Sequence, residues 1–278
     1  MTDTMEQTIS CNEPATAVDV LALATGLSKS KIKSAMTAGA VWTHKGSKTV
    51  RLRRAKATLQ SGEKISIYYS DKILSDTPIA PTLIVDNKNY SVWSKPVGLM
   101  SSGTRFGDHC AINRVVEKIL DRPVFLVHRL DKFAKGVMVL AHSKRCAAVL
   151  SKQFQDRTTK KIYKTIVTGI LDSPMQITES LDGKDANTRI AAIDHDDHHT
   201  LLQVEILTGR KHQIRRHLAS IGFPILGDRQ YSDSRFPQLQ LASVSLAFDC
   251  SNTGERVTFH LPTEDHPRLS DLRVTPDS

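Results

Sequence analysis

A loop that carries the sequence HRLD, residues 128–131, lies between two short apolar runs and constrains the fold more than any other feature of the chain. Residues 124–127 (VFLV) precede it, and residues 137–141 (VMVLA) follow after a polar link. Apolar runs of this length, rich in β-branched residues, indicate two strands joined by a loop. We therefore expect Asp131 to lie where a strand enters a loop.

The charges around Asp131 make it a candidate functional carboxylate. Arg129, Lys132 and Lys135 are close in sequence, and their positive field favours the ionised carboxylate and suits an anionic substrate. Taken alone, an Arg-x-Asp sequence in a loop is more often a surface ion pair than a catalytic site. The choice between the two interpretations depends on the rest of the chain.

Two later motifs change that balance. Residues 208–218 read TGRKHQIRRHL, and residues 222–228 read GFPILGD. With the HRLD loop, these motifs resemble the RluA-type family of RNA pseudouridine synthases. Three lesser matches to that family, at residues 95–99, 161–169 and 183–188, occur in the expected order. The resemblance covers roughly residues 83–263.

The patterns of the larger part of the chain predict an α+β domain. Ser143 is placed to cap a helix that runs to about Gln155, and residues 162–167 form a strand-like run. A helix beginning near Ile214 should end at Gly222. The resemblance implies a mixed, largely antiparallel sheet with a central cleft. We place this catalytic domain at residues 83–265, followed by a C-terminal tail at 266–278.

The net charge of +9 is concentrated near the N-terminus. Residues 28–62 contain nine Lys or Arg and no Asp or Glu, and the 29 basic residues elsewhere equal the 29 acidic residues of the chain. This is the pattern of a phosphate-binding module. The residues that we expect to contact RNA there are Lys29, Lys31, Lys33, Arg51, Arg53 and Arg54.

The same segment has the pattern of a small folded unit. Ser28 and Gly39 bracket a predicted helix, and residues 41–43 and 64–68 alternate like strands. Residues 15–71 resemble the S4-like (alpha-L) RNA-binding domain, although its usual Arg-Leu-Asp opening is Ala-Val-Asp here. The alternative is a solvated basic helix and hairpin. We expect a flexible N-terminus at residues 1–14 and a proline-containing linker at residues 72–82.

The resemblance assigns a role to each candidate site residue for the isomerisation of uridine, which needs no metal or cofactor. Asp131 is the catalytic residue, Arg129 fills the space left by the flipped base, Tyr163 stacks on the uracil, and Arg215 pairs with the carboxylate. Arg210, near a helix start with free backbone N–H groups, is a candidate phosphate site. The alternative for Tyr163 is a strand tyrosine whose ring packs in the core. The alternative for Arg215 is a charged residue on the solvated face of a helix.

Two departures from the family pattern concern the loop and substrate choice. After the aspartate the family usually has Asp-x-x-Thr-Ser-Gly, whereas Ala134 and Lys135 replace the two hydroxyl residues here. Near the end of the domain, residues 240–242 (QLA) stand where the family commonly has Leu-His-Ala. The first departure removes hydrogen bonds that shape the loop and adds a charge.

Other features narrow the function. Residues 194–199 (DHDDHH) could suggest a metal site, but their place between two strand-like runs favours a hairpin turn. The four cysteines are widely spaced, and the chain has no run of eighteen apolar residues, so we expect a cytoplasmic protein with no membrane contact. We also expect a monomer. The predicted activity is pseudouridine formation in structured RNA, with 23S ribosomal RNA favoured over tRNA by family analogy. The alternatives are a catalytically weakened RNA-binding or ribosome-assembly factor and, less favoured because no second carboxylate is placed to activate water, a glycosidic-bond hydrolase.

Overall fold

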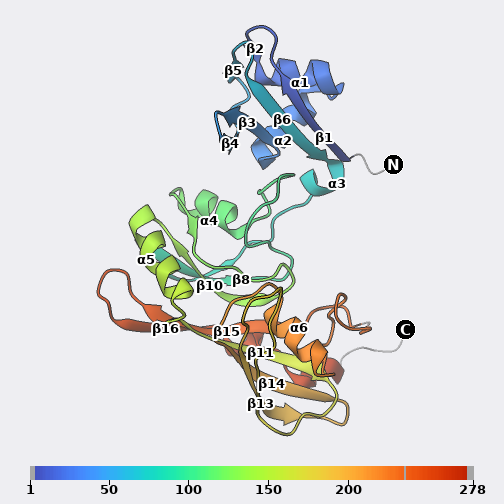
Figure 1. The fold of residues 1–278 in the computed structure, drawn as a ribbon, viewed down its shortest axis with the longest axis vertical. Coiled ribbons are helices and arrows are strands. Elements are labelled where there is room, and N and C mark those ends of the chain that lie inside the picture. Colours follow the sequence, from blue (N-terminus) through green and yellow to red (C-terminus); the bar gives the residue numbers. More distant parts are fainter. Residues whose placement is uncertain (1–3, 235, 274–278) are drawn as a thin grey trace. The chain divides into compact units, whose positions relative to one another are not determined.

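The computed structural model describes residues 4–234 and 236–273, which form two compact units (Figure 1). Unit 1 contains the described residues up to Ile79 together with Ser102–Leu120, and unit 2 contains Ala80–Ser101 and the described residues from Asp121 onward. The predicted catalytic domain was continuous from residue 83. In the structure, its residues 102–120 belong to the other unit.

Unit 1 is built on an antiparallel sheet with strand order β1-β6-β3-β4, and helices α1 and α2 share its hydrophobic core. Its elements are β1 (Thr4–Ser10), β2 (Ala15–Thr16), α1 (Ala17–Thr25), α2 (Lys29–Ala38), β3 (Val41–Lys45), β4 (Lys48–Arg51), β5 (Thr58–Leu59), β6 (Lys64–Ser70), α3 (Asp71–Leu74) and α4 (Ile112–Leu120).

Helix α2 confirms the predicted helix of the basic segment. The hydroxyl of Ser28 accepts a hydrogen bond from the backbone N–H of Lys31, and Gly39 ends the helix in the left-handed region at φ 82°. Ile32 and Met36, one turn apart, are fully buried. The cap, the glycine and the apolar spacing therefore act together to fix the helix.

The expectation of a flexible N-terminus is wrong for residues 4–10, which form strand β1. This strand pairs with β6 along its whole length, from Thr4 opposite Ser70 to Ser10 opposite Lys64. Met5 and Ile9 lie on one face of the strand and pack against the core of unit 1. The segment is polar in composition, but its exposed and partly buried residues alternate, as expected for a strand at the edge of a sheet. Residues 1–3 lie outside the described part.

The segment 102–120 joins unit 1 through polar contacts that no local pattern reveals. Asp108 forms ion pairs with Arg51, at 3.2 Å, and with Arg53. The backbone N–H of Asp108 donates to the carbonyl of Ala38, and the indole of Trp42 donates to the carbonyl of Arg105. The carboxylate thus neutralises part of the basic segment from a point far along the chain.

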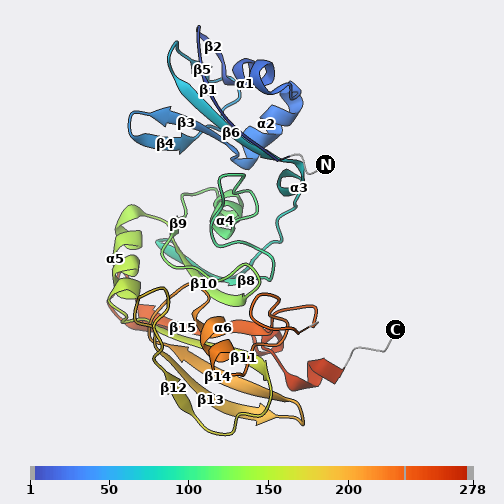
Figure 2. The ribbon, with the colours of Figure 1, turned by 45° about the vertical axis from the view of Figure 1, so that its right-hand side comes forward.

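Unit 2 is built on a ten-stranded sheet, counted over the described residues, with the path β12-β13-β14-β11-β15-β10-β8-β7 (Figure 2). Strand β16 pairs with β15, and β9 pairs with β10. Its strands are β7 (Thr82–Asn87), β8 (Tyr90–Lys95), β9 (Phe125–Leu126), β10 (Lys135–Ala141), β11 (Lys160–Thr168), β12 (Met175–Ile177), β13 (Thr188–His195), β14 (His199–Ile206), β15 (Leu241–Asp249) and β16 (Arg256–His260).

The pairings are antiparallel except that between β10 and β15, which is parallel and short. This confirms the predicted mixed, largely antiparallel sheet. Gly136 makes the parallel contact possible, because at its φ of 125° a Cβ would lie 2.2 Å from the backbone oxygen of Ser243. The strand–loop–strand arrangement around Asp131 is also confirmed, since β9 and β10 flank it.

Helices α5 (Lys144–Gln155) and α6 (Gln213–Ser220) belong to unit 2. Ser143 caps α5 as predicted, by accepting from the N–H of Cys146. Residues 194–199 lie at the turn between β13 and β14, as predicted, and the carboxylate of Asp196 accepts from the N–H groups of His198 and His199. The acidic and histidine residues of this cluster therefore stabilise a hairpin.

The end of the described chain packs on unit 2. Two 3-10 helices, Thr263–Asp265 and Leu269–Arg273, follow β16, and Leu269 and Leu272 contact the cluster of Ile166, Leu201 and Leu226. Part of the predicted tail is therefore ordered against the core, and residues 274–278 lie outside the described part. Within the described residues, no helix is long and apolar enough to span a membrane.

Candidate active site

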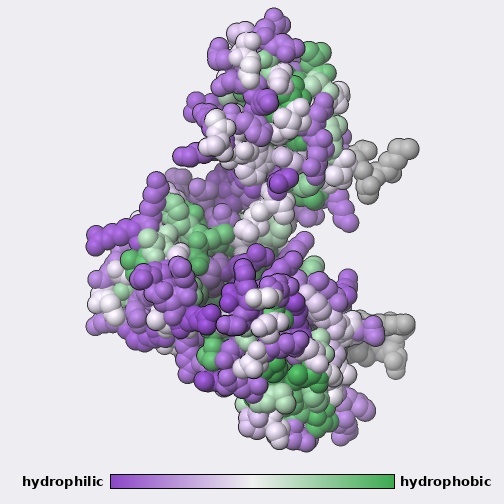
Figure 3. Space-filling model, in the orientation of Figure 1, coloured by the Kyte–Doolittle hydropathy of each residue, from purple (hydrophilic) through white to green (hydrophobic). Residues whose placement is uncertain are grey.

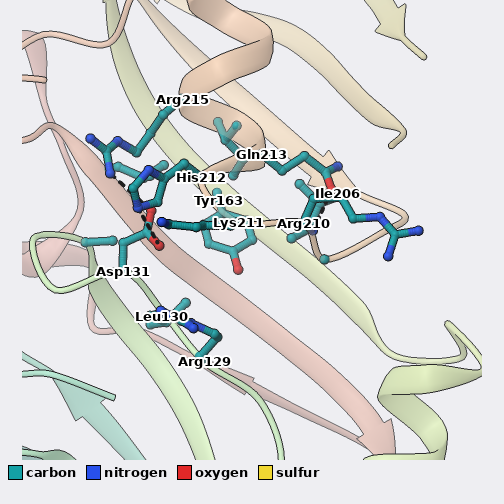
Figure 4. A pocket seen from close by; sticks show the side chains of 14 residues that line it. Arg129, Leu130, Asp131, Tyr163, Ile206, Arg210, Lys211, His212, Gln213 and Arg215 are labelled. Carbon is teal, nitrogen blue, oxygen red and sulfur yellow. Dashed lines mark hydrogen bonds and ion pairs between the residues drawn. The ribbon is translucent and has the colours of Figure 1, made fainter. Parts of the chain in front are cut away.

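A cavity of about 300 Å³ lies in unit 2, where the loop before β10, strand β11 and the start of α6 meet (Figure 4). Each of the five residues predicted for the site contributes to its lining: Arg129, Asp131, Tyr163, Arg210 and Arg215. These residues are far apart in sequence, and the sheet brings them together. The surface around α6 is strongly hydrophilic (Figure 3).

The backbone of the loop that carries Asp131 is held by the segment that follows β8. The hydroxyl of Ser101 donates to the carbonyl of Leu130 and accepts from its N–H. The carbonyl of Lys132 accepts from the N–H of Gly98 and from the ammonium group of Lys95. These bonds shape the loop in the absence of the two hydroxyl residues that the family usually has there.

Lys95 is fully buried, and its ammonium group donates to three carbonyls, those of Pro96, Leu99 and Lys132. Burial lowers the pKa of Lys95 to about 7, against the opposing effect of the charge of Asp131. The sequence motif at residues 95–99 therefore has a structural explanation. Its lysine ties two loops together.

His128 fixes the other end of the loop. Its Nε2 accepts from the backbone N–H of Val139, and its ring stacks on Phe154 with centroids 4.4 Å apart. Burial, and then the charge of Lys161, lower the pKa of His128 to about 3. The imidazole is therefore neutral, with its proton on Nδ1, and acts as an acceptor within the sheet.

Asp131 has Arg215 as its ion-pair partner, with Nη1 of Arg215 3.5 Å from Oδ2 of Asp131. The Asp131 side chain is 18% exposed and that of Arg215 8%. Neither Lys132 nor Lys135 pairs with Asp131 in the described part of the chain, although the sequence placed both nearby. The ammonium group of Lys132 instead lies 5.6 Å from the ring of Phe133.

Asp228 holds Arg215 in place and was not among the predicted site residues. Its two carboxylate oxygens accept from Nε and Nη2 of Arg215, each at 2.7 Å, and Oδ1 also accepts from the N–H groups of Gln230 and Tyr231. Burial alone would raise the pKa of Asp228, but these bonds lower it. Asp228 could have been noticed in the sequence, because it is the acidic residue at the end of the GFPILGD motif.

His212 is a second residue that the sequence analysis missed. Its Nε2 lies 3.8 Å from Oδ1 of Asp131 (Figure 4). Its Nδ1 lies 2.9 Å from the hydroxyl of Tyr231. Burial lowers the pKa of His212, against the charge of Asp131. A neutral imidazole that accepts from Tyr231 carries its proton on Nε2, toward Asp131.

Tyr163 lies on β11 and is 7% exposed, yet it lines the cavity. An irregularity in the pairing of β11 with β15 falls between Ile162 and Tyr163, and such bulges redirect a side chain at a site. Burial, and then the charge of Asp131, raise the pKa of Tyr163. The phenol therefore stays protonated beside the carboxylate.

Arg129 and Arg210 lie at the rim of the cavity. Arg129 is exposed on the loop, and Nε of Arg210 donates to the carbonyl of Asp185. The backbone N–H of Arg210, predicted to be free for phosphate, instead donates to the side chain of Gln213. At the rim, the guanidinium groups rather than that N–H are therefore the groups that could face an anion.

The six predicted RNA contacts of unit 1 differ in availability. Arg51 and Arg53 are partly buried and paired with Asp108. Lys29 and Lys31 form exposed ion pairs with Asp19, at 2.7 Å, and with Asp71, at 3.3 Å. Lys33 and Arg54 are exposed, and within the described residues neither has an ion pair.

The cavity is small, near the lower end of the roughly 300–1,000 Å³ of small-molecule pockets. It combines one carboxylate, a buried guanidinium, a protonated phenol and a neutral imidazole. No cluster of His, Cys, Asp or Glu that could hold a metal ion occurs among the described residues. The arrangement suits a planar polar ring next to a carboxylate, with phosphate groups at the cationic rim.

Comparison with known proteins agrees with this arrangement. A family model described as RNA pseudouridylate synthase matches residues 89–220. The "Uncharacterized RNA pseudouridine synthase" of Aquifex aeolicus is 33% identical over 235 residues, which cover 73% of this chain and 72% of that protein. The "Dual-specificity RNA pseudouridine synthase RluA" of Haemophilus influenzae is 32% identical over 214 residues, which cover 67% of this chain and 96% of that protein.

Solved structures show the same fold. The human RNA pseudouridylate synthase domain containing 4 has a TM-score of 0.52 and 25% identity, and the match covers 65% of this chain and 87% of that one. The human RNA pseudouridylate synthase domain containing 1 has a TM-score of 0.59 and 20% identity, and the match covers 73% of this chain and all of that one (100%).

The fold and the sequence relatives together define the chain as an RNA pseudouridine synthase, an isomerase that acts on RNA. Within that class it belongs to the RluA-type family, whose members in three bacteria match it at 28–32% identity.

Proposed function

We propose that Asp131 is the catalytic carboxylate of this synthase and that the cavity beside it holds the target uracil. The observation that carries the proposal is the meeting of Asp131, Tyr163 and Arg215 in one cavity, with Arg215 3.5 Å from Asp131. Pseudouridine formation breaks the bond between N1 of uracil and the ribose and joins C5 to the same carbon. The C5 proton leaves and N1 gains one, so the reaction balances without an oxidant, a reductant or a second substrate.

The other residues bind and orient the RNA. Tyr163 supplies a protonated aromatic face for the uracil, Arg215 pairs with Asp131 and orients it, and Arg129 fills the space that the flipped nucleotide leaves in the RNA. Arg210 binds a backbone phosphate at the rim. Asp131 then acts on either the electron-poor sugar or the base.

We propose uridines in 23S ribosomal RNA as the substrate, with tRNA as the alternative. The basic segment of unit 1 supports a structured RNA, and its residues 15–71 are proposed to be the S4-like RNA-binding domain. Relatives named dual-specificity RNA pseudouridine synthase are consistent with more than one RNA substrate. A monomer in the cytoplasm is part of the same proposal, which buried free thiols at Cys11, Cys146 and Cys250 suit.

Mapping pseudouridine in total RNA from cells with and without the gene tests the substrate. Positions that lose the modification in ribosomal RNA support the proposal, and losses confined to tRNA overturn it in favour of the alternative. No loss in either would support the second candidate, an RNA-binding factor that has lost catalysis. The hydrogen bonds that hold the loop of Asp131 argue against that candidate.

Asp131→Asn tests the catalytic role. The change keeps the size of the side chain and removes its charge, so release of tritium from RNA labelled at C5 of uracil should fall below detection. RNA binding should persist, since the cationic groups remain. Asp194→Asn, at the exposed end of β13, is the matched control and should react like wild type. Comparable release from wild type and Asp131→Asn would refute the assignment.

A further inference from the structure

A second and larger cavity, of about 570 Å³, also borders the ion pair between Asp131 and Arg215. Asp131, His212 and Arg215 line both cavities, so these three residues are shared between them. The new cavity lies in unit 2 and is not needed for the uracil. A group bound in it would be an immediate neighbour of the reacting base.

One side of this cavity offers an aromatic face. Phe133 follows Asp131 by two positions and is 54% exposed, although it is a large apolar side chain on a well-held loop. Val97, Pro237 and Leu239 supply further apolar lining. An exposed aromatic ring next to apolar walls suits the flat face of a nucleobase, because bases stack on aromatic side chains regardless of sequence.

The charges at the cavity fit a phosphate. Lys132 and Arg229 are exposed cationic side chains of the lining, and neither has an ion pair within the described part of the chain. The two carboxylates of the lining, Asp131 and Asp228, both pair with Arg215. The cations at the rim are therefore available to an anion, whereas the carboxylates are engaged.

We propose that this cavity is a second nucleotide-binding site, which holds the unpaired nucleotide adjoining the target uridine, with its base on Phe133 and its phosphate near Arg229. The proposal rests on the proposed function of the neighbouring cavity. It names a feature of the substrate: an RNA in which the target and an adjacent nucleotide are both unpaired.

The site is tested first with adenosine monophosphate and the full-length protein, by ligand-observed NMR titration, which does not depend on turnover. Phe133→Ala should weaken binding about fivefold or more, the loss expected for one stacked base, and Phe133→Trp should retain it. Arg229→Gln should weaken binding of the monophosphate but not of adenosine. Met175→Ala and Arg145→Gln, exposed positions elsewhere in unit 2, are the matched controls.

Turnover then shows whether the RNA uses the site. On the RNA identified by pseudouridine mapping, Phe133→Ala should raise KM about fivefold or more with little change in kcat. That effect should vanish when the adjoining nucleotide is abasic. Equal affinity of Phe133→Ala and wild type for adenosine monophosphate, or an equal KM effect on both RNAs, would overturn the site. Wild-type protein that binds the nucleotide but releases no tritium would contradict the proposed function and leave the site intact.

Discussion

Removing Asp228 tests how much the buried ion pair with Arg215 contributes to stability and, by comparison with a double variant, to catalysis. The side chain of Asp228 is fully buried, and Asp228→Leu removes the acceptor of two bonds from Arg215, each 2.7 Å long. Arg215, 8% exposed, is left with Asp131 at 3.5 Å as its remaining carboxylate. Losing one partner of a buried pair costs roughly 3–5 kcal/mol. At roughly 2–4 °C per kcal/mol for domains of this size, Tm should fall by about 6–20 °C.

Two further variants test the reasoning. Arg215→Met with Asp228→Leu removes both charges, and because apolar replacement of a buried pair is often neutral, the double variant should regain most of the stability. It should remain inactive in tritium release, since Asp131 has lost its partner. As a control, Asp182→Asn breaks an exposed ion pair, 2.9 Å long, with Arg216, the neighbour of Arg215 on α6. This change should lower the free energy of unfolding by no more than about 1 kcal/mol. A double variant as unstable as Asp228→Leu, or one with wild-type activity, would refute the argument.

Three other predictions concern His212, His128 and the basic residues of unit 1. Tyr231→Phe removes the donor to Nδ1 of His212, so kcat should fall several-fold with KM for RNA unchanged, and an unaltered kcat would exclude a role for this bond. Burial lowers the pKa of His128 to about 3. The imidazole therefore stays neutral in the folded protein at pH 5, whereas in the unfolded chain it binds a proton below about pH 6.5. Stability therefore decreases as pH falls, by roughly 2 kcal/mol at pH 5, and His128→Gln should remove this decrease in urea unfolding curves at pH 5 and 7. Replacing Lys33 and Arg54 by Gln should lower the log–log salt slope of RNA binding by roughly 0.7–0.9 for each phosphate that is no longer bound, and an unchanged slope would show that neither residue binds RNA.

Elements with local signals could be predicted from the sequence. The helix after Ser28 and the helix after Ser143 have a cap and a spaced apolar face, and the structure has both. The strand at residues 4–10 was not predicted, because Met5 and Ile9 are the two apolar residues on its inner face. Its partner β6 also lies about sixty residues away in the sequence. Local composition carries no information on such a pairing.

The parts of the site that could be predicted are those that lie in continuous sequence motifs. The five expected residues line one cavity, but the residues that orient them were not identified. Asp228 belongs to a motif in which no role was predicted for it. His212 lies 3.8 Å from Asp131 and has a left-handed conformation, with φ at 53°, at the start of α6. Asp108 lies about fifty residues from its arginine partners. Such pairings depend on the tertiary fold, which periodicity does not specify.

The placement of residues 102–120 in unit 1 determines how the two units are tethered. The chain passes between them three times, near residues 79–80, 101–102 and 120–121. A protease that cuts once within residues 72–79 would separate the N-terminal segment covalently, but the ion pairs of Asp108 with Arg51 and Arg53 would still hold that segment to residues 102–120, which remain joined to unit 2 on both sides. A gene truncated after residue 79 would lack the carboxylate that pairs with Arg51 and Arg53. Units 1 and 2 are thus interleaved along the chain, and exchanging either one between proteins requires three junctions rather than one.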